Sequence, residues 1–101
     1  MQRSELVDLV LKQAADINET LTAQIPLDRG ADAPLYGRDG SLDSLGLVSL
    51  LAAVEQAVEE EYGVTITLAD ERAVSQKHSP FRTVGSLADY VALLVSESAV
   101  R

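Results

Sequence analysis

The sequence contains no cysteine and no tryptophan, and only one of its 101 residues is a histidine. The lack of cysteine excludes disulfides, thiolate metal sites and cysteine nucleophiles. Aromatic residues make up 4% of the chain, so its core must be built mainly from aliphatic side chains. A chain of this length can form one domain with a modest core, and we expect a single domain over residues 1–101.

Long hydrophobic runs are also absent. The longest mostly apolar stretch, residues 45–54, is interrupted by Ser49 and is too short to span a bilayer. Residues 1–15 lack the apolar core of a signal peptide. We therefore expect a soluble cytoplasmic protein that does not associate with membranes.

Basic residues are scarce, and the net charge is −8. This balance argues against nucleic-acid binding, because lysine and arginine must neutralise the phosphates. Half of the acidic residues lie between Asp39 and Glu71, where no lysine or arginine occurs. A stretch of one sign can steer basic partners, and it can equally serve solubility.

Three runs of apolar residues at helical spacing predict an all-α fold, a small three- to four-helix bundle. The predicted helices cover residues 4–23, 44–62 and 84–97, with a short helical turn over 68–74. Residues 64–67 alternate as in a strand, but the chain offers no partner strand, so we expect an extended connector. Two prolines and three glycines predict that residues 24–43 form a long loop without regular structure. Loops of this length in small domains are often functional.

Local signals also predict how the helices begin and end. We expect Ser4 to cap the first helix, Gly63 to end the second, and Ser86 with Asp89 to form a capping box on the last. Four aliphatic residues of the long loop are expected to hold it against the core: Ile25, Leu27, Leu35 and Leu42.

The tetrad Leu42-Asp43-Ser44-Leu45 opens the second predicted helix and is the one place where the sequence suggests covalent chemistry. The free N–H groups and the dipole of a helix N-terminus favour an anion, so a phosphodiester on the Ser44 hydroxyl would lie in a favourable field. Capping is the alternative role, because serine and aspartate are both common N-cap residues. The tetrad by itself leaves both roles open.

Three segments in order make the chain resemble the acyl carrier protein family over nearly its whole length, from about Leu6 to Val95. The first is the tetrad itself. The second is EEEYGVTI at residues 59–66, a helix end in which acidic residues are followed by an aromatic residue, a glycine and aliphatic residues. The third is FRTVGSLADYV at residues 81–91, which resembles the last helix of that family.

The resemblance implies that Ser44 carries a 4′-phosphopantetheine arm, transferred from coenzyme A by a phosphopantetheinyl transferase, with Asp43 helping the transferase to position its substrate and metal. The protein would then be a monomeric carrier and not an enzyme. It would hold an acyl group as a thioester on the arm and present it to acyl-activating, acyl-transferring or condensing enzymes that have basic patches. The second helix would be the recognition helix, with four candidate partner contacts: Leu45, Val48, Glu55 and Glu59. For the two glutamates, a solvated helix face is the alternative.

The chain departs from the family pattern beside the serine. Ser41 stands in place of the glycine in the common Gly-x-Asp-Ser-Leu, and Gly46 and Ser49 occupy positions where fatty-acid carriers often have acids. These departures favour a dedicated lipid, polyketide or secondary-metabolite pathway over housekeeping fatty-acid synthesis.

Other interpretations stay open. One is an aminoacyl or peptidyl carrier, although peptidyl carriers usually have Gly-Gly-x-Ser and Asp43 departs from that. Another is an unmodified binding module of the same fold, against which the intact Ser44 argues. An enzyme would need a base for Ser44; His78 is the only histidine, and no Gly-x-Ser-x-Gly motif is present. Four loop aspartates, at positions 28, 32, 39 and 43, lack EF-hand spacing, so we expect no dedicated metal site.

Overall fold

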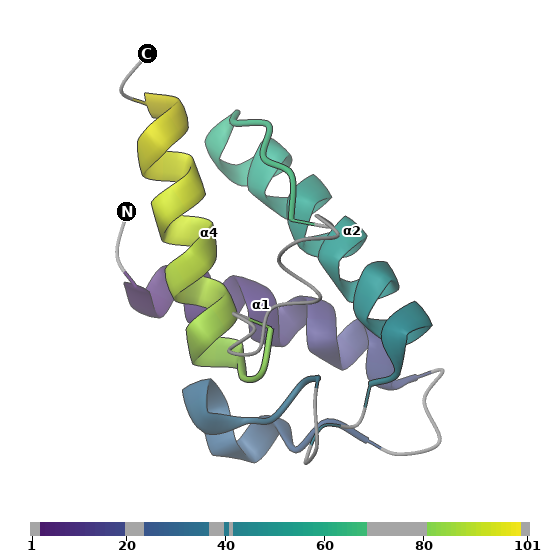
Figure 1. Cartoon of the computed structure of the whole chain (residues 1–101). Helices are drawn as coiled ribbons and strands as arrows, with labels where there is room; N and C mark the ends of the chain where they lie inside the picture. Colours follow the sequence, from purple (N-terminus) through teal and green to yellow (C-terminus); the bar gives the residue numbers. More distant parts are fainter. Residues whose placement is uncertain (1–2, 20–23, 37–39, 41, 69–80, 100–101) are drawn as a thin grey trace.

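The computed structural model of the chain describes residues 3–19, 24–36, 40, 42–68 and 81–99 (Figure 1). These residues form three α-helices and one 3-10 helix: α1 (Arg3–Asn18), η1 (Leu27–Asp32), α2 (Ser44–Tyr62) and α4 (Val84–Ala99). This described part contains no strand, and its extended pairings are two isolated bridges. The radius of gyration of 12.5 Å is close to the ~13 Å expected for a compact chain of 100 residues. The predicted small all-α bundle is therefore confirmed.

Helix α1 crosses the bundle and packs against both α2 and α4 (Figure 1). Its fully buried side chains, Leu6, Val10 and Ala14, recur every four residues and form the stripe that faces the core. The helix begins at Arg3, so Ser4 lies within the first turn. The prediction that Ser4 caps this helix is therefore wrong.

The C-terminal end of α1 is also shorter than predicted. The helix ends at Asn18 and not at residue 23, and Glu19 already lies in a turn. The Asn18 side chain explains this end, because its Nδ2 donates to the Ile25 carbonyl oxygen at 3.1 Å and its Oδ1 accepts the Ile25 N–H at 2.8 Å. These two bonds hold residue 25 against the helix end, so the chain turns back. Residues 20–23 lie outside the described part.

The long loop contains one regular element, which corrects the prediction that it has none. Helix η1 consists of two tight turns joined at Gly30, with Arg29 N–H donating to the Pro26 carbonyl at 3.1 Å and Ala33 N–H donating to Gly30 at 3.0 Å. Proline and glycine exclude an α-helix here, but they are compatible with short 3-10 turns. As predicted, three of the four aliphatic loop residues are buried and the fourth is half-buried: Ile25, Leu35, Leu42 and Leu27.

Helix α2 covers the predicted range. Its core stripe is fully buried and comprises Leu47, Leu50, Leu51, Val54 and Val58. Gly63 ends the helix with φ 65°, a conformation that favours glycine, and its N–H donates to the Glu59 carbonyl at 2.9 Å. Residues 64–68 form an extended connector, with Ile66 and Leu68 buried and the intervening Thr67 exposed. The turn predicted over 68–74 otherwise lies outside the described residues, as does His78.

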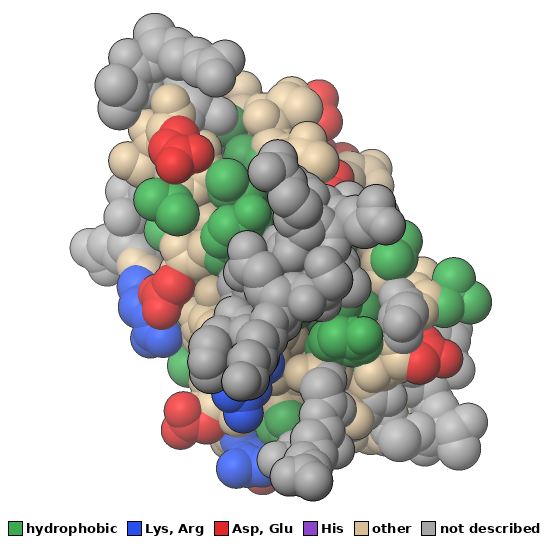
Figure 2. Space-filling view, viewed as in Figure 1, with side chains coloured by type: hydrophobic (Ala, Val, Ile, Leu, Met, Phe, Trp, Pro, Cys, Tyr) green, Lys and Arg blue, Asp and Glu red, His purple; other side chains and the backbone are tan. Residues whose placement is uncertain are grey.

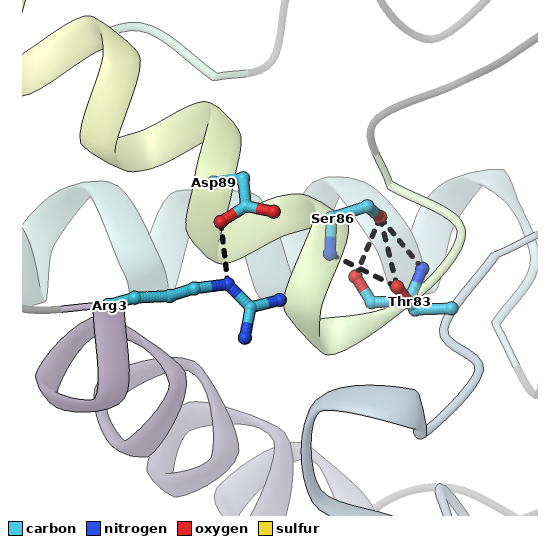
Figure 3. A network of polar contacts seen from close by, with 4 residues as sticks. All are labelled: Arg3, Thr83, Ser86 and Asp89. Atoms are coloured by element: carbon cyan, nitrogen blue, oxygen red, sulfur yellow. Dashed lines mark hydrogen bonds and ion pairs between the residues drawn. The ribbon is translucent and has the colours of Figure 1, made fainter.

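The start of α4 is capped differently from the prediction. Thr83 and Ser86 form a reciprocal capping box, in which each side-chain oxygen accepts the other residue's backbone N–H at 3.1 Å (Figure 3). Asp89, the expected partner of Ser86, instead forms an exposed ion pair with Arg3 on α1 at 2.7 Å (Figure 3). The helix starts at the predicted residue and continues to Ala99 instead of residue 97. None of the described helices is long and apolar enough to cross a membrane.

Candidate functional site

The predicted attachment serine is the first residue of α2, and Asp43 before it is the N-cap. Asp43 has extended backbone angles, with φ −88° and ψ −176°, and its Oδ1 accepts the Gly46 N–H at 2.7 Å. Its carbonyl oxygen accepts the first helical bond, from Leu47 N–H at 2.9 Å. Asp43 therefore fulfils the capping role that the sequence leaves open between Asp43 and Ser44. The side chain of Ser44 lies outside the described part of the structure.

Gly46 completes this cap. A Cβ at this position would lie 3.2 Å from Asp43 Oδ1 and 3.2 Å from a methyl carbon of Leu42. A larger side chain would therefore press on the capping carboxylate and on a buried leucine. This contact gives a physical reason for the glycine at a position where the sequence comparison with carriers led us to expect an acid.

The approach to α2 is fixed by backbone pairing with a distant segment. Residues 33–36 bond to residues 81–84 through three hydrogen bonds: Leu35 N–H to the Arg82 carbonyl at 2.7 Å, Tyr36 N–H to Phe81 at 3.1 Å, and Val84 N–H to Ala33 at 3.0 Å. On the other side, Leu42 N–H donates to the Leu35 carbonyl at 3.0 Å. We call residues 33–36, 40, 42 and 81–84 the loop tie. The loop tie joins the start of α4 to the residue before the N-cap of α2, so both helix starts have fixed relative positions.

Gly40 is the glycine that the loop tie requires. A Cβ on Gly40 would collide with the Leu35 carbonyl oxygen and lie 2.8 Å from the Tyr36 Cα. The chain passes this closely because residue 42 pairs back onto residue 35. Sequence reasoning counted Gly40 among the residues that break regular structure in the loop and did not predict this close approach.

Two of the four predicted partner contacts lie on the surface beside Ser44. Leu45 is 76% exposed and Val48 is 46% exposed, which makes them two of the three large hydrophobic side chains exposed among the described residues. Figure 2 shows hydrophobic side chains at the surface over the first half of α2. Ser49 and Ala52 are also exposed on this side, and sequence reasoning proposed neither as a partner contact. Their helical spacing from Leu45 is the signal that could have identified them.

The two predicted glutamate contacts differ from each other. Glu55 is half-buried, and its Oε1 accepts the backbone N–H of the buried Leu68 at 3.0 Å, so this carboxylate holds the connector against α2. Glu59 is exposed on the following turn. The structure therefore gives Glu55 an internal role that sequence reasoning did not assign, while Glu59 lies on the solvated face.

An acidic groove of about 430 Å³ lies between α1 and the far end of α2. Its charged lining consists of Glu5, Asp8, Lys12, Glu60 and Glu61, and Tyr62 lies beside them. Burial raises the pKa of the Tyr62 hydroxyl, and the charges of Glu5 and Glu61 raise it further. Eighteen residues of helix separate Tyr62 from Ser44, about 27 Å at 1.5 Å per residue. The groove is therefore separate from the start of α2.

A second hollow, of about 380 Å³, lies against the loop tie and is lined by Arg29, Asp32, Tyr36 and Arg82 among others. Its two arginines are 53 positions apart in the sequence, so no local pattern could have predicted their meeting. Among the described residues, no cluster of three acidic or histidine side chains is arranged to hold a metal ion.

We also compared the chain with known proteins. No family model, no curated protein and no solved structure matches the chain.

Proposed function

We propose that the protein is a carrier that holds an acyl group as a thioester on a 4′-phosphopantetheine arm attached to Ser44. The observation that carries the proposal is the position of Asp43-Ser44-Leu45 at the start of α2. There, the aspartate caps the helix, the serine is its first residue and the leucine is exposed to solvent. The resemblance of three ordered sequence segments to acyl carrier proteins supports the same function.

The capping geometry weakens the simplest alternative, in which the serine only caps the helix. An N-cap side chain accepts an N–H from the second or third helical residue. Asp43 already makes this bond with the third residue, Gly46. Capping therefore explains the presence of Asp43 and leaves Ser44 available for another role.

The site has the features that an attached phosphodiester requires. A helix N-terminus has a positive field that favours a phosphate group in the first turn. The loop tie fixes the backbone before the serine, so an enzyme meets a helix start of defined shape. The arm, once bound, would supply the thiol that forms the thioester, and the chain's own residues would position the arm and present a surface to partners.

The proposal extends to the partners and the setting. A phosphopantetheinyl transferase would load the arm from coenzyme A, and acyl-activating, acyl-transferring or condensing enzymes would use it. Gly46 and Ser49, where fatty-acid carriers often have acids, favour a dedicated pathway of lipid or secondary metabolism in the cytoplasm.

Intact-protein mass tests the proposal directly. The full chain is incubated with coenzyme A and a broad-specificity phosphopantetheinyl transferase, beside the variants Ser44→Ala and Ser96→Ala. Ser96 is an exposed serine on α4 and controls for non-specific modification. We expect the wild type and Ser96→Ala to gain one phosphopantetheine and Ser44→Ala to gain none. A folded, initially unmodified wild type that gains nothing would refute the carrier function.

A further inference from the structure

Helix α2 has a second stripe on the side opposite its core stripe. Leu45, Val48, Ser49 and Ala52 follow one another at the i, i+3, i+4 and i+7 positions of one helix face, and all four are exposed. We call these four residues the docking stripe. Together with the buried residues, they make the first half of α2 apolar or small on nearly every side. A helix of this composition is normally buried, so its exposure points to a surface that another molecule covers.

The docking stripe lies in a long segment of α2 that has no charged residues. No charged residue occurs from Ser44 to Val54, and the first acid beyond them, Glu55, is engaged with Leu68 N–H. The free acids start at Glu59, fifteen residues from Ser44, which is about 22 Å along the helix. Figure 2 shows this division, with hydrophobic side chains over the first half of α2 and acidic side chains at its far end.

Of the described residues that flank Ser44 in the sequence, the charged one is Asp43. Its carboxylate accepts the Gly46 N–H and lies at the positive end of the helix dipole, so both groups offset its charge locally. The acids at the far end lie beyond two Debye lengths at physiological salt, where the screening length is about 8 Å. The described acids at the far end of α2 therefore contribute little to the electrostatic field at Ser44 at physiological salt, despite the net charge of −8.

Any enzyme that acts on the Ser44 hydroxyl must cover the surface around it. Residues three and four positions apart on a helix have Cβ atoms about 5–6 Å apart, so an enzyme that reaches Ser44 also contacts Val48, as well as the adjacent Leu45. If Ser44 is the attachment site, as proposed above, we infer that the enzyme surface docking there is apolar, encloses Leu45 and Val48, and gains little from charge attraction. A basic patch on such an enzyme would meet Asp43 and, beyond it, the acids at the far end of α2.

This inference differs from the expectation, drawn from the resemblance, that partner enzymes bind through basic patches. An acidic recognition face predicts association that weakens as salt rises, whereas an apolar face predicts a rate that is almost independent of salt. Burial of exposed leucine and valine side chains favours binding in proportion to the area removed from water. A charge placed there would be buried without a partner and would oppose docking.

The test uses the phosphopantetheinyl transferase as the probe. Initial rates of Ser44 modification give kcat/KM for the wild type, Leu45→Asp, Val48→Asp and the volume-conserving Leu45→Met, with Leu93→Asp as the matched control. Leu93 is a leucine on α4 that is 53% exposed and lies outside the docking stripe. Circular dichroism verifies that each variant is folded. Each protein is measured from about 0.1 M to 1 M salt, over which the Debye length falls from about 10 Å to 3 Å.

We expect Leu45→Asp and Val48→Asp to lower kcat/KM at least about tenfold, the effect of removing one well-buried side chain from an interface. Leu45→Met and Leu93→Asp should stay within about twofold of the wild type, and the wild-type value should change by less than about threefold across the salt range. If Leu45→Asp and Val48→Asp lower kcat/KM no more than Leu93→Asp does, or if wild-type kcat/KM falls steeply with salt, the inference is wrong and the carrier function stands. If folded wild type is not modified at all, both are wrong.

Discussion

The two roles of Asp43 can be separated by substitution. Its Oδ1 accepts the Gly46 N–H at 2.7 Å, which stabilises the first turn of α2. The resemblance to carriers adds a second role, in which the carboxylate helps the transferase. Asparagine keeps an acceptor oxygen and caps helices as well as aspartate does, whereas alanine has no acceptor. The variant Asp43→Asn therefore removes only the charge, whereas Asp43→Ala removes both the charge and the cap.

The expected stability changes follow from the geometry of this cap. Replacing a capping aspartate with alanine costs about 0.5–2 kcal/mol. An exposed carboxylate at a helix N-terminus contributes a further 0.3–1 kcal/mol, roughly, at low salt, and both variants lose this term. We expect Asp43→Asn to lose less than about 1 kcal/mol and Asp43→Ala about 1–3 kcal/mol. In a domain of this size, each kcal/mol lowers Tm by roughly 4–8 °C.

Two measurements on the same preparations distinguish the roles. Urea unfolding followed by circular dichroism gives the free energy of unfolding, and modification of Ser44 by the transferase gives kcat/KM. We expect Asp43→Asn to keep most of its stability but lose most of its kcat/KM, and Asp43→Ala to lose both. Wild-type kcat/KM in Asp43→Asn would show that Asp43 is a cap only. Wild-type stability in Asp43→Ala would refute the capping argument.

Three further predictions test other parts of the fold. Gly40→Ala should lower the free energy of unfolding by about 1–3 kcal/mol, because its Cβ collides with the Leu35 carbonyl; urea unfolding measures it, and an unchanged midpoint would contradict it. Glu55→Ala should cost about 1.5–3 kcal/mol in the same assay through its lost charged hydrogen bond, whereas Glu59→Ala should cost under about 0.5. Because the pKa of Tyr62 is raised above 10.0, the folded state keeps the proton that the unfolded state loses. Stability should therefore fall above pH 10, and less in Tyr62→Phe, as unfolding at several pH values would show.

The range of α2 could be predicted from the sequence because its signals are local. Its core residues repeat at helical spacing within one segment, and the first and last residues are set by Asp43 and Gly63 next to them. The aliphatic loop residues were predictable for a similar reason, since a leucine or isoleucine in a polar loop has few stable places other than the core. The same signals located the candidate serine at the first position of the helix.

The errors occurred where two local patterns competed or where a distant residue decided. Ser86 has a possible capping partner on each side. Because α4 begins at Val84, Ser86 is its third residue and pairs with Thr83, while Asp89 pairs with Arg3, eighty-six positions away. Asn18 ends α1 through Ile25, a contact that requires the chain to have turned already. The loop tie depends on pairing between segments nearly fifty positions apart, and the close approach at Gly40 depends on residue 42 pairing back onto Leu35, a contact that no local pattern predicted.

The position of the charges along the chain matters more for the candidate site than the net charge does. An exposed apolar stripe beside the candidate attachment serine favours association with any apolar surface, including a second copy of the same chain. A net charge of −8 makes identical copies repel one another, and no charged residue occurs from Ser44 to Val54, the segment that contains the docking stripe. The same separation leaves the stripe free of charge, so an apolar enzyme surface can cover it without burying a carboxylate. Acidic residues placed at a distance from Ser44 can therefore keep the chain monomeric while docking depends on leucine and valine.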